Sequence, residues 1–131
     1  MITVLVDHDI EGQAMMLWAA LGADGWPEVF PIRFMLFSQV GLPEDSNDRT
    51  VWRFAQQNRM ILLTGNRRMK EDDSLERTIR EENTPASLPV ITIGRIKRVI
   101  EKKYREQCQA QLLNILLDLD NYLGTARIFI P

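Results

Sequence analysis

The chain has 131 residues, of which 45% are hydrophobic and 26% are charged, and its formal net charge is −2. The length and composition predict one folded domain over residues 1–131 and exclude a largely disordered chain. The net charge lacks the basic excess of a dedicated nucleic-acid binder but leaves room for a local basic patch. No apolar stretch approaches the roughly 18 residues of a membrane span, and no basic segment typical of a signal peptide opens the chain. The single cysteine, Cys108, excludes an intrachain disulfide and a cysteine-based zinc site. We therefore expect a cytoplasmic protein without membrane contact.

The first half of the chain alternates between apolar runs and amphipathic segments. Residues 1–6 are apolar and β-branched, which predicts a buried strand that ends at the acidic segment 7–9. Apolar residues at i, i+3, i+4 and i+7 over 14–21 predict a helix. Residues 32–37 have the length and composition of a second strand, and the turn-forming residues of 38–47 predict a loop.

The second half continues the alternation. Helices are expected over 48–58, 73–83 and 101–123, and strands over 60–64, 88–93 and 127–130. Continuously apolar strands separated by helices predict parallel pairing, with helices on both faces of the sheet. We therefore expect a three-layer α/β/α domain around a central, mainly parallel five-stranded sheet.

Acidic and amide residues follow three of the predicted strands. Asp7 and Asp9 come after the first strand, Asp48 begins the helix after the second, and Asn66 and Asp73 come after the third. The carboxyl ends of parallel strands meet at one edge of a sheet, where converging carboxylates repel each other unless a cation neutralises them. Oxygen ligands without a thiolate suit Mg²⁺ or Mn²⁺, which can activate water and stabilise charge on a transferring phosphoryl group.

Structural roles also account for part of this pattern. Asp9, Asp48 and Asp73 each stand where a residue can cap the following helix. Asp7 is harder to explain in this way, because it directly follows a buried strand, where an unpaired carboxylate is costly. His8, the single histidine, is expected to point into the adjacent layer rather than to bind a metal.

A small basic cluster stands beside the predicted metal site. It consists of Arg67, Arg68 and Lys70. These side chains could hold the phosphate backbone of an RNA, or they could belong to a solvated loop.

Several short motifs together resemble the PIN-like domain family of toxin-type ribonucleases, in its compact single-domain branch. The motifs are Val6-Asp7-His8-Asp9, Gly41-Leu42, Asn47-Asp48, the segment Leu63-Thr64-Gly65-Asn66-Arg67-Arg68-Met69, and the apolar run from Leu88 to Ile91. The resemblance covers roughly residues 2–95. The remaining helix and last strand are compatible with it but carry no motif.

The resemblance implies a PIN-like fold with an acidic pocket at one edge of a parallel sheet, and hydrolysis of RNA phosphodiesters with Mg²⁺ or Mn²⁺. It implies that Asp7 is the first metal ligand and Asp48 the second acidic residue. The chain departs from the family at the third motif, where Asn66 and Arg68 stand in place of two aspartates. Asn66 can still ligate through its carbonyl oxygen, whereas Arg68 cannot. We infer that Asp72 or Asp73, a few residues further on, replaces the missing carboxylates.

Two functions remain open from the sequence. One is a metal-dependent endoribonuclease, for example the toxin of a toxin–antitoxin pair, with RNA, an antitoxin protein and a second copy of the chain as expected partners. The other is a catalytically degenerate PIN-like protein that binds RNA or a protein, with exposed apolar residues such as Trp26, Trp52 or Met69 at the interface. A phosphoacceptor receiver domain is disfavoured because Thr64 and Gly65 stand where it needs an aspartate, and a Rossmann nucleotide binder because no Gly-x-Gly-x-x-Gly follows a strand.

Overall fold

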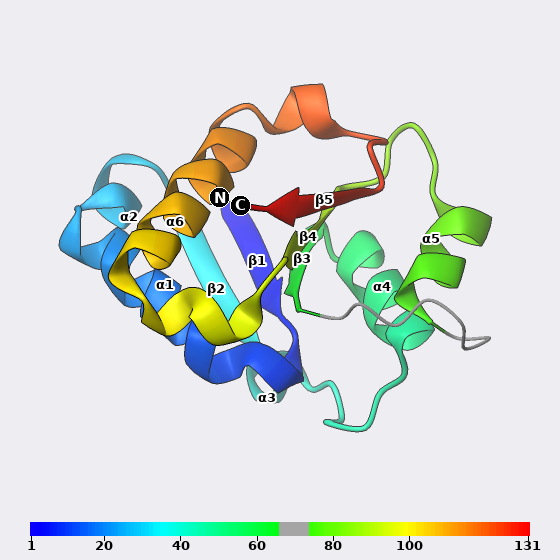
Figure 1. Ribbon diagram of the computed structural model, residues 1–131. Helices are drawn as coiled ribbons and strands as arrows, with labels where there is room; N and C mark the ends of the chain where they lie inside the picture. The colour runs from blue at the N-terminus through cyan, green and yellow to red at the C-terminus, as the bar shows by residue number, and fades with distance from the viewer. Residues whose placement is uncertain (66–73) are drawn as a thin grey trace.

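Five parallel strands form one sheet in the computed structural model, which describes residues 1–65 and 74–131 (Figure 1). The strands are β1 (Ile2–Val6), β2 (Ile32–Leu36), β3 (Met60–Thr64), β4 (Val90–Ile93) and β5 (Arg127–Ile130). Their order is β2-β1-β3-β4-β5, and each neighbouring pair is parallel. The expected five-stranded sheet is confirmed, and it is parallel throughout.

The burial of the strands explains their sequences. β3 and β4 lie inside the sheet, and every residue of both is buried, which is why their sequences are apolar without alternation. β2 lies at an edge and alternates between buried and exposed positions at its start. β5 lies at the other edge, where Phe129 is 43% exposed.

Helices cover both faces of the sheet. The described helical segments are η1 (His8–Ile10), α1 (Glu11–Ala23), α2 (Trp26–Val29), α3 (Phe37–Val40), α4 (Asp48–Gln57), α5 (Leu75–Glu82), η2 (Ile96–Ile100), α6 (Lys102–Leu117) and η3 (Leu119–Tyr122), where η marks a 3₁₀ helix. Figure 1 shows α1 and α6 on one face and α4 and α5 on the other, which confirms the three-layer α/β/α prediction. None of the described helices is long and apolar enough to cross a membrane.

Each face of the sheet has its own hydrophobic core. Val4, Val6 and Leu63 point to the α1 and α6 side, where they belong to a large cluster that includes the buried Cys108. Leu5 and Leu62, the alternate residues of the same strands, pack with the residues of α4 and α5. This alternation follows from the period of two in a strand and decides which helices each strand residue packs against.

Two predicted elements need correction. The segment 38–47 is a loop in its later part, but it begins with the short helix α3, which ends at Gly41 in the left-handed conformation with φ 77°. The helix expected over 101–123 ends at Leu117 and is followed by the 3₁₀ turn η3.

The apolar residues expected at an exposed interface are also placed differently. Trp52 is 5% exposed and packs in the core between α4 and the sheet. Trp26 is partly buried and packs against the core on the α1 and α6 side. Met69 lies outside the described residues.

Candidate functional site

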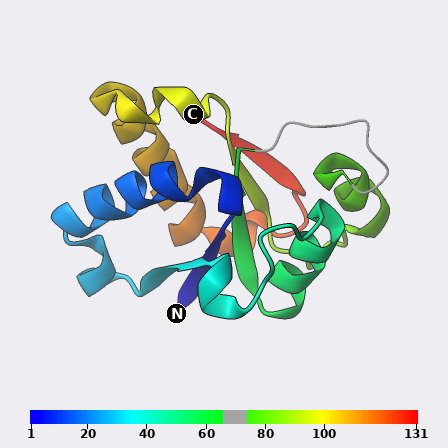
Figure 2. The ribbon, with the colours of Figure 1, turned by 90° about the horizontal axis from the view of Figure 1, so that it is seen from below.

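Asp7 lies at the point where the chain reverses direction across the sheet. β1 pairs with β2 on one side and β3 on the other, and ligand sites in doubly wound sheets form at such a switch point, outside the carboxyl ends of the strands. The Asp7 N–H donates to the Leu63 carbonyl at 2.9 Å, which extends the β1–β3 ladder by one residue. Thr64, the last residue of β3, donates from Oγ1 to Asp7 Oδ2 at 2.6 Å. Figure 2 views the molecule from the side of this edge.

The surroundings of Asp7 oppose its negative charge. Burial raises the pKa of Asp7 above its usual value of 3.8, and the neighbouring carboxylates of Asp9 and Asp48 raise it further. The hydrogen bonds from Thr64 and from the backbone of Asp9 act in the opposite direction and lower the pKa, but less than burial raises it. A cation in this place would relieve both the desolvation and the repulsion.

A cavity of about 310 Å³ opens beside Asp7. Its described lining consists of Asp7, Asp9, Phe37, Glu44, Asp45, Ser46, Asn47, Asp48, Val51, Leu62 and Leu75. Five of these residues are acidic, and none of the described lining residues is basic. The cavity is several times larger than the roughly 30 Å³ share of one water molecule, so it can hold a hydrated cation or a phosphate group.

Asp48 faces the cavity from the first turn of α4. Its Oδ2 accepts a hydrogen bond at 3.0 Å from the backbone N–H of Leu75, the first residue of α5. The expected capping role of Asp48 is wrong, because Asn47 is the N-cap and accepts from the Thr50 N–H at 2.8 Å. The N-cap of α5 is Ser74, whose side chain accepts from the Arg77 N–H, while Asp73 lies outside the described residues. Asp48 therefore joins the starts of two helices at the edge of the cavity.

Asp9 and His8 lie in the 3₁₀ turn that follows Asp7. Asp9 lines the cavity and does not cap α1 through its side chain, which corrects the capping interpretation. The side chain of His8 is one-third exposed, with Nδ1 2.9 Å from Glu11, Nε2 3.5 Å from Glu44 and its ring 6.2 Å from the ring of the buried Phe37. The hydrogen bond to Glu11 raises the pKa of His8 above 6.5. The contact with Glu44 links η1 to the loop that carries this glutamate.

The donor atoms beside the cavity fit a hard divalent cation in type but not in number. Asp7, Asp9 and Asp48 offer carboxylate oxygens, the ligands that Mg²⁺ and Mn²⁺ prefer. Over residues 1–65 and 74–131, however, no three His, Cys, Asp or Glu side chains form a group that could hold a metal ion. The other predicted site residues, Asn66, Arg67, Arg68, Lys70, Asp72 and Asp73, lie outside the described residues.

Sequence reasoning missed two parts of this edge. Glu44 and Asp45 line the cavity, although the turn-forming residues around them predict a plain loop. An exposed basic surface on η2, with Arg95, Lys97 and Arg98, lies at the same edge of the sheet. The signal was present in the sequence, since residues 95–106 contain six Lys and Arg against two Glu.

Comparisons with protein-family models, with curated proteins and with solved structures find no match for this chain. The resemblance to PIN-like domains therefore stays a prediction. A doubly wound sheet hosts many unrelated activities, so function has to be inferred from the chemistry of the Asp7 cavity.

Proposed function

We propose that the chain is a metal-dependent ribonuclease of the PIN-like type, with its site in the Asp7 cavity. The observation that carries the proposal is the carboxylate of Asp7, which is held at the switch point of the sheet by Thr64 although burial and two neighbouring carboxylates oppose its charge. A carboxyl group in a cleft whose pKa is raised by burial and by neighbouring charges is a candidate functional-site residue. Oxygen donors in an acidic cavity favour a divalent cation rather than an organic cofactor.

In this proposal Asp7, Asp9 and Asp48 would contribute oxygen ligands to Mg²⁺ or Mn²⁺. They do not form a complete metal-holding group within the described residues, so the predicted ligands Asn66 and Asp73 would have to complete the set. The bound cation would supply an activated water and stabilise the charge that develops on a phosphodiester. Thr64 orients the Asp7 carboxylate, and the bond from Leu75 orients that of Asp48. The cavity has room for one phosphate group beside these side chains.

A calorimetric titration with Mn²⁺ tests the proposal in the wild type and in Asp7→Asn, followed by incubation of both with a mixed single-stranded RNA. We expect the substitution to weaken Mn²⁺ binding by at least about 100-fold, since it removes a charged ligand, and to abolish cleavage. Glu44→Gln is the matched control, because Glu44 lines the same cavity but is 80% exposed. Equal Mn²⁺ affinity in Asp7→Asn and wild type would reject the assignment.

A second candidate is a catalytically degenerate protein of the same fold, acting as an RNA- or protein-binding module, for example toward an antitoxin. The lack of a complete metal-holding group within the described part of the chain favours it. It predicts a folded wild type that neither binds Mn²⁺ nor cleaves RNA in the same experiment.

A further inference from the structure

A second charged surface adjoins the acidic cavity at the carboxyl edge of the sheet. Gly65 lies directly after β3, and a Cβ atom at this position would lie 3.1 Å from Ile10 Cγ2 and 3.5 Å from Ile96 Cβ. η1, which carries Asp9 and ends at Ile10, and η2, which begins at Ile96, therefore pack over the same point of the chain. The residues that flank Ile96 in the sequence, Arg95 and Lys97, are both exposed.

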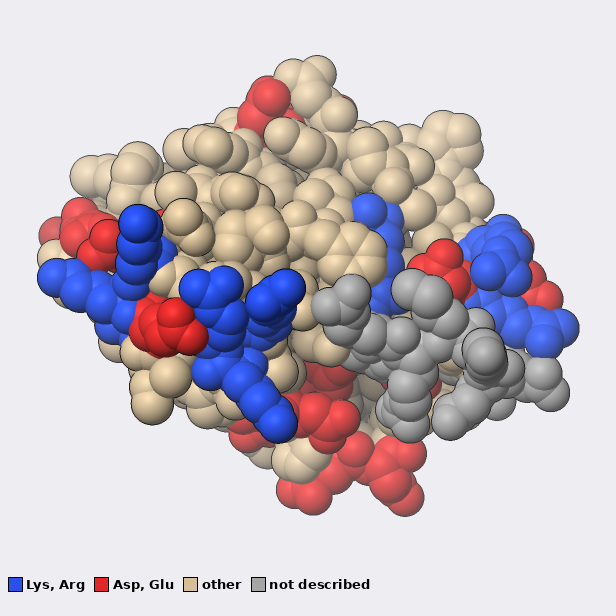
Figure 3. All heavy atoms as spheres, in the orientation of Figure 1, with Lys and Arg blue, Asp and Glu red and all other residues tan. Residues whose placement is uncertain are grey.

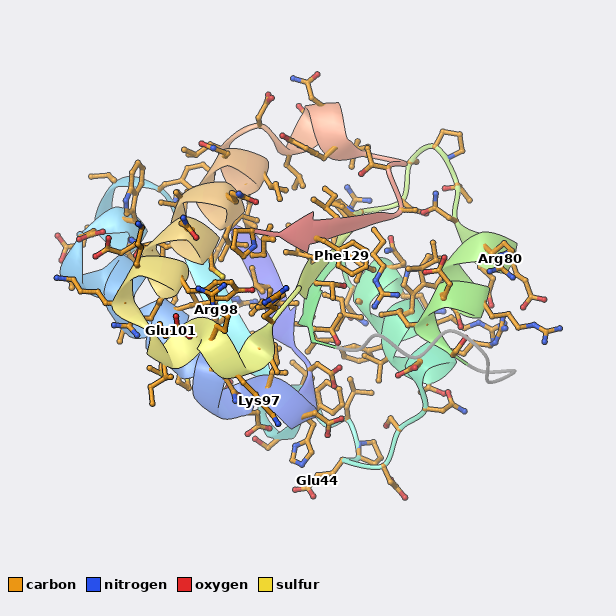
Figure 4. All side chains as sticks on the ribbon, in the orientation of Figure 1. Glu44, Arg80, Lys97, Arg98, Glu101 and Phe129 are labelled. Atoms are coloured by element: carbon orange, nitrogen blue, oxygen red, sulfur yellow. The ribbon has the colours of Figure 1, made fainter. Side chains whose placement is uncertain are left out.

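We call Arg95, Lys97 and Arg98 the η2 cluster. All three side chains are exposed, and residues 95–106 carry a net charge of +4 in a chain whose net charge is −2. Figure 3 shows Lys and Arg side chains gathered over η2 and the start of α6, with a group of Asp and Glu side chains below them. In the view of Figure 4, Lys97 lies between Arg98 and Glu44, a residue of the acidic cavity.

The buried side chain of Tyr104 organises the η2 cluster. Its hydroxyl oxygen accepts a hydrogen bond from the Arg95 N–H at 2.8 Å, and the Arg98 guanidinium lies 4.7 Å from the centre of its ring. Arg98 also binds Glu101, whose carboxylate lies 3.2 Å from Nη2. Arg105 donates to the carbonyls of Val99 and Ile100, which holds the end of η2. The basic side chains thus extend from a fixed turn and not from a free loop.

A hollow of about 530 Å³ lies between these residues, lined by Gly94, Arg95, Arg98, Tyr104, Gln107 and Pro131. Two guanidinium groups and an amide offer N–H donors to it, and guanidinium groups match the geometry of phosphate oxygens. A nucleic-acid strand that enters the acidic cavity meets repulsion there, which cations on the neighbouring turn would offset.

We propose that the η2 cluster binds backbone phosphates of a single-stranded RNA whose adjoining phosphate reaches the Asp7 cavity, an inference that rests on the proposed ribonuclease function. The cluster lies at the same sheet edge as Asp7, so one strand can contact both. An acidic protein segment, the other polyanion that such a surface could bind, has no reason to reach the neighbouring acidic cavity.

Fluorescence anisotropy with a labelled oligouridylate in EDTA tests this proposal without cleavage. We expect the triple variant Arg95→Gln, Lys97→Gln, Arg98→Gln to bind at least about 10-fold more weakly than wild type, and the slope of log affinity against log salt to become shallower by about 2, as three lost phosphate contacts require. The control Arg33→Gln, Arg59→Gln, Arg80→Gln removes the same charge from exposed residues elsewhere and should retain wild-type binding. Figure 4 shows Arg80 on the opposite side of the molecule from the cluster.

Lys97→Glu alone provides a second variant with little risk to folding, since Lys97 is exposed, and it should weaken binding more than Arg80→Glu. Wild-type affinity and salt slope in the triple variant would overturn the proposal, as would a wild type that binds polyglutamate but not the RNA. RNA binding that depends on the η2 cluster, without cleavage in Mn²⁺, would support the RNA-binding role of the cluster and reject the proposed ribonuclease function. If the triple variant cleaves RNA with an unchanged KM, the result would support the proposed ribonuclease function and reject the RNA-binding role of the η2 cluster.

Discussion

The surroundings of Asp7 disfavour the ionised form of its carboxyl group. Its backbone continues the β1–β3 ladder and its side chain accepts from Thr64, so two adjacent residues of β3 fix its position. Burial and the carboxylates of Asp9 and Asp48 nevertheless raise its pKa. A residue that is held firmly against an electrostatic cost is more readily explained by binding of a cation than by stability.

Asp7→Asn should stabilise the metal-free protein at neutral pH by roughly 1 kcal/mol, because the amide keeps an acceptor for Thr64 and removes the buried charge. The native pKa of Asp7 is above its usual 3.8, so the native state binds this proton more tightly than the unfolded state does. The stabilising effect of the protonated group is therefore complete below about pH 3.8 and is lost as the pH rises through the native pKa.

Urea unfolding in EDTA, from below pH 3.8 to neutral pH, measures the difference in unfolding free energy between Asp7→Asn and wild type. The increase in unfolding free energy caused by Asp7→Asn should be small below the pKa that Asp7 has in the unfolded chain. It should reach a plateau above the pKa that Asp7 has in the native protein. Asp45→Asn, which alters an exposed carboxylate of the same cavity, should show a much smaller change. A variant less stable than wild type at neutral pH would show that the ionised carboxylate is a net stabilising group.

Single residues differ in how far the sequence predicts their roles. Asp7 could be identified because it follows an apolar run that is too uniform to be anything but buried. The partner of Asp48 could not, since the Leu75 N–H lies 27 positions along the chain and is brought near by the packing of α5 on α4. Trp52 was predicted wrongly because nothing local distinguishes an exposed tryptophan from one that fills the space between a helix and a sheet.

At the scale of elements, apolar runs predicted all five strands, and the prediction was simplest for β3 and β4, because a strand buried on both faces has few alternatives. The turn η2 was missed because its sequence, IKRVI, is only five residues long, so the helical spacing of Ile96, Val99 and Ile100 extends over too few residues to predict an element. Val99 in it is buried while Ile100 is 74% exposed, an arrangement decided by packing against α1 and α6. The candidate RNA surface depends on this turn and was missed with it.

Two glycines should respond to alanine with opposite signs. Gly124 has φ 80°, its N–H donates to Ser87, and a Cβ would lie 2.9 Å from the Pro85 carbonyl oxygen. Gly124→Ala should therefore cost about 2–4 kcal/mol of unfolding free energy. Gly22 lies in α1, where an added Cβ would meet nothing within 4 Å, so Gly22→Ala should stabilise by about 0.5–1 kcal/mol.

Thermal and urea unfolding of the two variants, compared with wild type, measure both effects. Because each substitution adds the same methyl group, the comparison isolates backbone conformation and local space from hydrophobicity. Destabilisation by both substitutions to the same extent would contradict the left-handed turn at Gly124, which directs the chain into β5.

The whole molecule separates its charges in a way that its net charge conceals. Residues 95–106 are strongly positive and the cavity around Asp7 is strongly negative, while the net charge of the whole chain is −2. The average composition correctly excluded a globally basic protein. It could not locate a basic surface, because the place of such a surface depends on which turns the fold brings to the same edge of the sheet. Fields of opposite sign at neighbouring sites can orient a charged ligand as well as attract it.

Cys108 offers a probe of how cooperatively the molecule unfolds. The thiol is fully buried in the core between the sheet and the α1 and α6 helices, and burial raises its pKa to about 11. In native buffer at mildly alkaline pH it should react with a disulfide reagent at least about 1,000-fold more slowly than in urea, because reaction requires unfolding of this core.

The variant Val29→Cys provides the comparison within one molecule, since Val29 is 76% exposed and its thiol should react at once. If the core opens as a unit, the slow Cys108 phase should follow global stability. Asp7→Asn should then slow it further and Gly124→Ala should accelerate it, although both residues are remote from Cys108 in sequence. A Cys108 rate that responds to neither substitution would mean that α6 opens locally, and the surface that α6 supports through Tyr104 would then have to be treated as an independently mobile part of the molecule.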